Sequence, residues 1–173
     1  MCKKIIFITL LLLSSLCARE NISIEEVLKT NYEESNITVK KKSLILSKQE
    51  TKNIQATAHA KVHSKLVRYY EIRKEEKLLG HAILLKQRVR TKSVAVLYMV
   101  DANKTMIGLE ILSFKEPREY KPHQEWQNIF VGKRSDDKLI AGQDVPTISG
   151  ATLSARVITE SARIALAIVT TQL

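Results

Sequence analysis

The sequence predicts an α+β fold in which an antiparallel sheet of about four strands is flanked by helices. Residues 66–114 alternate between apolar and polar side chains in four consecutive runs, which are separated by short polar turns. Such short connections join antiparallel strands, because parallel strands need a long crossover. Near the C-terminus, residues 157–169 repeat apolar side chains at helical spacing, which gives a broad face for packing on a sheet.

Length and composition favour one folded domain. The chain has 173 residues, of which 45% are hydrophobic and 27% are charged, so a substantial core is available. With only five Gly and three Pro, it does not resemble a disordered or low-complexity chain.

The first 18 residues have the build of a secretory signal peptide. Lys3 and Lys4 precede an apolar run over 5–13, and small and polar residues follow before the charged Arg19. The run is short for a membrane span, although an uncleaved N-terminal anchor remains the alternative. We therefore expect an exported protein, either periplasmic or on the outer face of the cytoplasmic membrane, whose domain occupies residues 19–173.

Cysteine usage excludes several chemistries. Both cysteines, Cys2 and Cys17, lie in or at the end of this N-terminal segment. Disulfides, cysteine-ligated metals and thiol catalysis are therefore not expected in the domain.

Two helices and an extended segment are expected before the sheet. Apolar spacing predicts a short amphipathic helix over 22–31, and residues 37–46 indicate either a strand or an irregular extended segment. Ser47 and Glu50 have capping-box spacing, which predicts a helix over about 48–60.

The four predicted strands follow directly. They cover residues 66–72, 78–89, 93–100 and 106–114, with a polar turn at 74–77 and a hairpin turn at 101–104. A loop over 115–120 and a helix carrying Trp126, Ile129 and Phe130 come next, and residues 132–145 look irregular.

The final helix has two distinct faces. Ile158, Ala162 and others form its apolar side, while Arg156, Glu160 and Arg163 share the opposite side at a spacing that suits helical ion pairs.

A hydroxyl-rich turn, residues 146–154, leads into this helix. It places Thr152 on or just before the first helical turn, where free backbone N–H groups and the positive end of the helix dipole favour a phosphate. Gly150 and Ala151 carry little bulk, so a ligand could approach the backbone closely. The alternative is that the Ser and Thr side chains here are ordinary N-caps.

Other chemistries find little support. His59 and His63 have a zinc-compatible spacing but no third ligand, so they are interpreted as residues of a helix end, and no metal site is expected. The chain also lacks a dinucleotide fingerprint, a phosphate-binding P-loop and a nucleophile elbow.

The charge of the chain is basic, at +10. The only tight basic run is Lys40 to Lys42, and elsewhere the basic residues alternate with acidic ones. This excess suits an anionic membrane surface or an anionic cofactor, whereas nucleic acid is a poor partner for an exported protein.

Residues 147–154, Thr-Ile-Ser-Gly-Ala-Thr-Leu-Ser, followed by an apolar helix, resemble the FMN-binding domain family. That family includes the small extracytoplasmic flavin-carrying subunits of the Rnf complex and of the sodium-pumping NADH:quinone oxidoreductase, and NosR. Upstream features resemble the family in the same order over about 66–170. They are Gly80-His81, a Glu-Pro loop over 114–120, and Trp126 with Phe130-Val131-Gly132-Lys133.

The resemblance implies FMN as the cofactor and a phosphoester between its phosphate and the Thr152 hydroxyl, made by a separate flavin transferase. The implied cofactor-binding residues are Thr152, Ser149, Gly150, Ala151, Leu153, Arg156 and Glu116. It also implies an electron carrier that exchanges electrons with a membrane-bound redox complex or another electron-transfer protein. Because the flavin ring carries the redox chemistry, no catalytic residue is expected.

The chain departs from the family at one position. The family commonly has an Asp six residues before the modified Thr, where this chain has Pro146, and Asp144 is two residues too early. Two other functions therefore stay open: a binding or assembly module of the same fold without flavin, and an FMN-dependent reductase with its own substrate.

Overall fold

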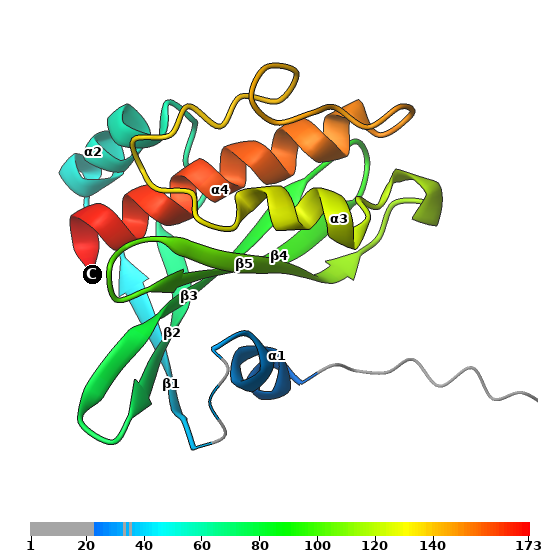
Figure 1. The fold of residues 1–173 in the computed structure, drawn as a ribbon. Helices are drawn as coiled ribbons and strands as arrows, with labels where there is room; N and C mark the ends of the chain where they lie inside the picture. The colour runs from blue at the N-terminus through cyan, green and yellow to red at the C-terminus, as the bar shows by residue number, and fades with distance from the viewer. Residues whose placement is uncertain (1–22, 33, 35) are drawn as a thin grey trace, which may run out of the picture.

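A computed structural model describes residues 23–32, 34 and 36–173, and the predicted signal peptide lies outside them. A five-stranded antiparallel sheet in the order β1-β2-β3-β4-β5 forms the centre of the fold (Figure 1). The elements are α1 Ile24–Asn31, β1 Thr38–Ile45, α2 Lys48–Ala58, β2 Leu66–Lys74, β3 Lys77–Arg88, β4 Ser93–Asp101, β5 Met106–Phe114, α3 Gln124–Gln127 and α4 Thr152–Gln172, with short 3₁₀ turns at Arg118–Tyr120 and Asn128–Phe130. The α+β prediction is confirmed, and β1, which the sequence left open between strand and irregular segment, is the fifth strand.

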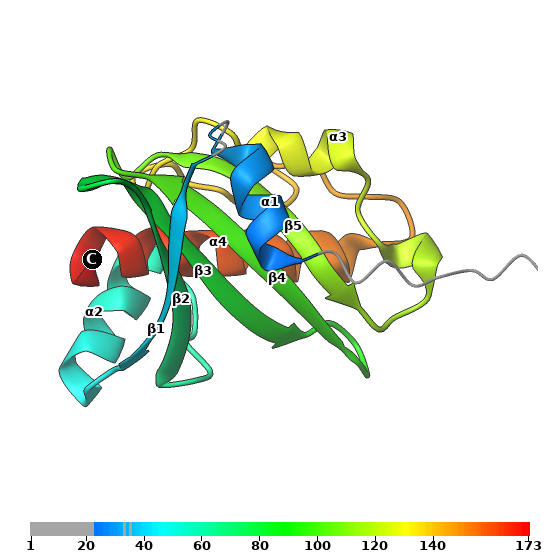
Figure 2. The ribbon, with the colours of Figure 1, turned by 90° about the horizontal axis from the view of Figure 1, so that it is seen from below.

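The helices lie on both faces of the sheet. Helices α2, α3 and α4 cover one face, while α1 packs on the other (Figures 1 and 2). Two apolar clusters result, one beneath α4 with Tyr98 and Phe130 fully buried, and a smaller one beneath α1 around Leu28 and Met99. Most of the core therefore lies between α4 and the sheet, and this packing fixes the position of the start of α4.

Helix α4 is anchored to the sheet through buried contacts. Ile158 and Ala162 are fully buried, as the apolar face predicted, and the Tyr98 hydroxyl donates a hydrogen bond to the Ile158 carbonyl over 3.0 Å. No helix among the described residues is long and apolar enough to cross a membrane.

The predicted ion pairs on the polar side of α4 are wrong. Among the described residues, no ion pair joins Glu160 to either neighbouring arginine. Arg163 instead donates to the carbonyl of Ala58 at the end of α2, over 2.7 Å, and to that of Leu139. Arg163 thus connects α2 and the 132–145 segment to α4. It binds these backbone carbonyls instead of Glu160 because they lie close to its guanidinium.

The capping box of α2 is confirmed. The Ser47 hydroxyl accepts from the Glu50 amide over 3.2 Å, and the Glu50 carboxylate accepts from the Ser47 amide over 2.7 Å. The helix ends at Ala58, two residues earlier than predicted, because His59 has a left-handed backbone with φ of 48°. His59 therefore belongs to a helix end, and His63 lies exposed in the following loop.

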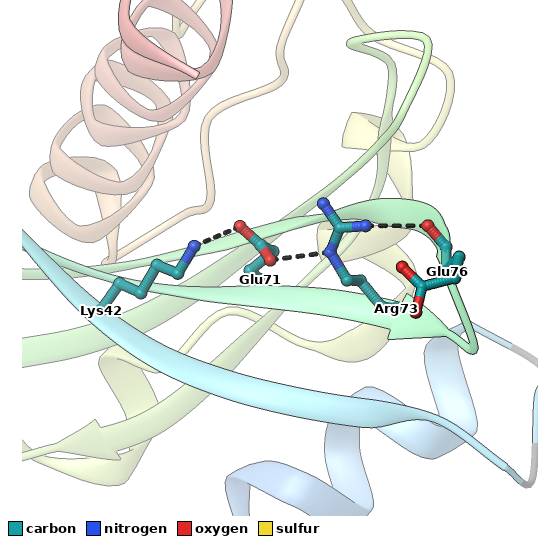
Figure 3. A network of polar contacts seen from close by, with 4 residues as sticks. All are labelled: Lys42, Glu71, Arg73 and Glu76. Carbon is teal, nitrogen blue, oxygen red and sulfur yellow. Dashed lines mark hydrogen bonds and ion pairs between the residues drawn. The ribbon is translucent and has the colours of Figure 1, made fainter.

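An ion-pair network joins the edge strand to its neighbour (Figure 3). Glu71 on β2 accepts from Lys42 of β1 over 2.5 Å and from Arg73 over 2.8 Å, and Arg73 also donates to the Glu76 carbonyl. The hydrogen bonds from Lys42 and Arg73 lower the pKa of Glu71 to about 2 and, in return, the pKa of Lys42 is raised. One lysine of the basic run is therefore part of the sheet rather than of a free cationic patch.

Candidate functional site

The turn before α4 leaves a hydroxyl and a helix terminus free. Thr152 is the first residue of α4 and is exposed, and the N-cap position is held by Ala151, which has no side-chain capping bond. The N-cap alternative is therefore wrong for Thr152. Because the first amides of a helix have no acceptor within it, the N–H groups of 152–154 are available to an anion.

A buried hydroxyl lies beside these amides. Ser154 is only 1% exposed, and its Oγ has no hydrogen-bond partner among the described residues. It lines a small hollow together with Gly150, Ala151 and Leu153. An unsatisfied buried hydroxyl costs free energy, so the Ser154 hydroxyl, like the free amides beside it, is available to a ligand.

The opposite wall of this hollow is formed by Glu116, Arg90 and Tyr120. Glu116 is 8% exposed and accepts from the backbone amides of Lys92 over 2.8 Å, Thr91 over 2.9 Å and Arg90 over 3.1 Å. These hydrogen bonds keep the pKa of Glu116 below its usual value, and the bond from the Lys92 amide has the largest effect. The carboxylate therefore stays ionised and shapes the turn between β3 and β4.

The hollow also contains residues that sequence reasoning missed. The Arg90 guanidinium lies 5.0 Å from the centre of the Tyr120 ring, a cation–π geometry. Neither Arg90 nor Ser154 was singled out, because one lies in a polar turn and the other looked like a cap. The available signal for Ser154 was its nearness in sequence to Thr152, whereas Arg90 lies 26 residues before Glu116 and had no local signal.

The segment leading into the turn is held by Trp126. Its indole N–H donates to the Pro146 carbonyl over 2.7 Å, and its ring packs edge-on against Phe130 at 5.2 Å. Pro146 thus takes part through its backbone. From this point the chain reaches the exposed Ser149 and then Gly150, whose φ of 75° lies in the region that favours glycine.

Asp144 has a structural role away from the turn. Its carboxylate accepts from the amides of Leu139 over 2.7 Å and Ile140 over 2.6 Å. Desolvation raises its pKa, but the amide hydrogen bonds outweigh this effect and the pKa is lowered. Asp144 therefore closes its own loop.

A second, larger hollow of about 360 Å³ borders the same end of α4. Arg156, one helical turn after Thr152, lies at its edge on the same side of the helix. The lining carries three basic side chains and one acidic one, and it includes Arg156, Arg163, Lys138, His59, Glu160, Ile140 and Ala141. Of the predicted site residues, Gly150, Ala151, Leu153 and Glu116 surround the small hollow and Arg156 lies beside the large one, while Ser149 and Thr152 are exposed and line neither.

Comparison with known families identifies the region. Residues 91–167 match the family model described as FMN-binding domain. This part of the chain is similar to the FMN-binding domain family. FMN is therefore its cofactor, and the protein is a flavoprotein.

The matched segment of the FMN-binding domain begins in the turn between β3 and β4 and ends inside α4. It thus contains Glu116, Tyr120, Trp126 and the Thr152 turn, whereas Arg90 of the small hollow lies just outside it. Helices α1 and α2 and strands β1 to β3 lie outside it. No curated protein and no solved structure gave a significant match to the chain.

Proposed function

We propose that this protein is an exported FMN carrier, in which the FMN phosphate is esterified to Thr152 and the flavin exchanges electrons with a membrane redox partner. The observation that carries the proposal is the position of Thr152. It is exposed at the first position of α4, where no side chain caps the helix, and it lies inside the matched FMN-binding segment.

The residues around Thr152 fit the phosphate of FMN, which becomes a phosphodiester when it is joined to the Thr152 hydroxyl. The free amides of 152–154 and the dipole of a 21-residue helix favour negative charge at this point. The unpartnered Ser154 hydroxyl supplies one more donor, and Arg156 adds a cation one turn along. Formation of the ester joins Thr152 Oγ1 to phosphorus. Formally, the proton of the Thr152 hydroxyl and one hydroxyl group of the phosphate leave as water.

Carrier function is favoured over turnover of a separate substrate. When bound, the isoalloxazine ring supplies the redox chemistry, and the protein positions it. Of the nearby carboxylates, Glu116 is engaged by three backbone amides and Asp144 by two. Neither of these two carboxylates is free to move a proton for a substrate, which favours electron transfer over turnover at the small hollow.

Export is supported by the sequence of residues 1–18 and is consistent with covalent attachment. A phosphoester would keep FMN on a protein outside the cytoplasm, where a dissociated cofactor would be lost. The partner is then a redox protein in or at the membrane, and a flavin transferase acts as the modifying enzyme.

The test is in-gel flavin fluorescence after co-expression with a flavin transferase. Wild-type protein should fluoresce on a denaturing gel, and Thr152→Ala should abolish the signal. Thr147→Ala is the matched control, because Thr147 is an exposed threonine in the same turn, and it should keep the signal. Fluorescence that survives Thr152→Ala, or a wild-type band without fluorescence, would overturn the attachment at Thr152.

A further inference from the structure

The sheet splits between its second and third strands. Pairing between β2 and β3 stops at Arg68 and Leu84. Beyond this point β1 continues to pair with β2 as far as Leu66, and β3 continues to pair with β4 as far as Arg88. The two halves of the sheet therefore separate at this end instead of continuing the ladder.

The split opens into a hollow of about 380 Å³. Ile164 and Ile168 of α4 form its floor, and the connection between α2 and β2 borders it. The strand and loop residues in the lining are Val62, His63, Ser64, Leu66, Val67, Arg68, Leu84, Leu85, Lys86, Gln87 and Ala95. This volume falls within the usual range of small-molecule sites.

The chemistry of the lining is that of an apolar slot with a cationic rim. Most of the lining side chains are apolar, and none is acidic. Arg68 and Lys86 are exposed on adjacent strands, and neither makes an ion pair within the described part of the chain. By contrast, Lys42 and Arg73 elsewhere on the sheet are paired with a carboxylate.

We propose that this split binds a single-chain amphipathic anion, a medium- or long-chain alkyl carboxylate. The alkyl chain lies in the slot against Ile164 and Ile168, where it removes apolar surface from water. The carboxylate lies at the rim between Arg68 and Lys86. Charge complementarity favours this ligand over a neutral one, because a neutral ligand leaves both cations without a partner.

This site is separate from the flavin site. Ile164 lies 12 residues after Thr152 on α4, which corresponds to about 18 Å along the helix. Most of the lining also comes from β2, β3 and the loop before β2, outside the segment that matches the FMN-binding domain. The proposal therefore does not depend on covalent attachment of FMN.

The test is calorimetric titration of the full chain with sodium decanoate below its micelle concentration, with decanol and sodium acetate as comparison ligands. Decanoate should bind at one saturable site, and decanol and acetate should each bind at least about tenfold more weakly. The double variant Arg68→Glu/Lys86→Glu should lose about tenfold in decanoate affinity, since it reverses two charges at the rim.

The double variant Lys115→Glu/Lys121→Glu is the matched control. It changes the net charge by the same amount at exposed positions away from the split, and it should bind decanoate like the wild type. Three outcomes would overturn the proposal: no saturable decanoate binding, equal affinity for decanol, or equal loss in both double variants. A dimer that covers the split would appear as the first of these.

Discussion

At the scale of single residues, the flavin site depends on which polar groups already have partners. Ser154 and Thr170 both carry buried hydroxyls without a partner, at opposite ends of α4. We expect Ser154→Ala to weaken non-covalent FMN binding by about fivefold, the effect of one lost hydrogen bond, with little change in stability of the flavin-free protein. Thr170→Val should leave FMN affinity unchanged. Fluorescence-quenching titration with FMN measures both, and equal effects would contradict a ligand role for Ser154.

Glu71 predicts an acid-dependent loss of stability. Its pKa of about 2 in the folded protein lies below the ordinary value of 4.5, so its ion pairs stabilise the fold above about pH 4.5. This contribution is lost as pH falls from about 4.5 to 2. The difference in unfolding free energy between wild type and Glu71→Gln should therefore shrink over this range. Urea unfolding at pH 7 and pH 3 measures it, and a difference independent of pH would exclude this role.

Gly80 is required where the β2–β3 pairing contains a bulge. A Cβ at this position would lie 2.1 Å from the Val100 carbonyl oxygen and 2.8 Å from the Asp101 Cα, both backbone atoms that cannot move aside. Gly80→Ala should cost about 3 kcal/mol in the free energy of unfolding, as severe overpacking does. Gly132→Ala, at φ of 82° with open space around it, should cost only about 1 kcal/mol from backbone strain. Chemical denaturation compares the two, and equal costs would disprove the close-approach argument.

At the scale of elements, α3 fixes the path of the chain into the Thr152 turn. Trp126→Phe removes the indole N–H that binds the Pro146 carbonyl but keeps a ring against Phe130. We expect a loss of about 1 kcal/mol in stability and slower flavin loading, because the turn loses one of its supports. Time-resolved in-gel fluorescence during flavin transfer tests this. Wild-type loading rates in Trp126→Phe would show that α3 does not order the turn.

The elements themselves were largely predictable from local patterns. Alternation gave four strands, and the Ser47–Glu50 spacing gave α2. Strand β1 was ambiguous because its three consecutive lysines interrupt the alternation of apolar and polar residues. It is a strand because it pairs with β2, and the contact from Lys42 to Glu71 is part of that pairing. The role of Arg163 depends on carbonyls brought close by folding, which no local pattern contains.

At the scale of the whole molecule, the sequence located the Thr152 turn but not the surroundings that complete it. The small hollow joins residues from β3–β4, the Glu116 loop and α4, which are about 25 to 60 residues apart. Likewise, the split in the sheet begins where the pairing between β2 and β3 stops. The alternation of apolar and polar residues continues along both strands past that point, so the sequence does not show where the pairing ends.

The split in the sheet and the flavin site at Thr152 should act independently. Since the split and Thr152 are separated by about 18 Å of helix, variants at one should not affect the other. Arg68→Glu/Lys86→Glu should therefore load FMN to the wild-type extent when co-expressed with a flavin transferase. In-gel fluorescence per mole of protein tests this, and reduced loading would mean that the rim of the split contributes to flavin attachment.

The central claim is that Thr152 carries the flavin through its hydroxyl. Tandem mass spectrometry of proteolytic peptides from co-expressed protein tests this most directly. We predict that the peptide containing residues 147–154 gains the mass of FMN less one water, with fragment ions that place the addition on Thr152. An unmodified peptide, or an addition on Ser149, Ser154 or Thr147, would contradict it.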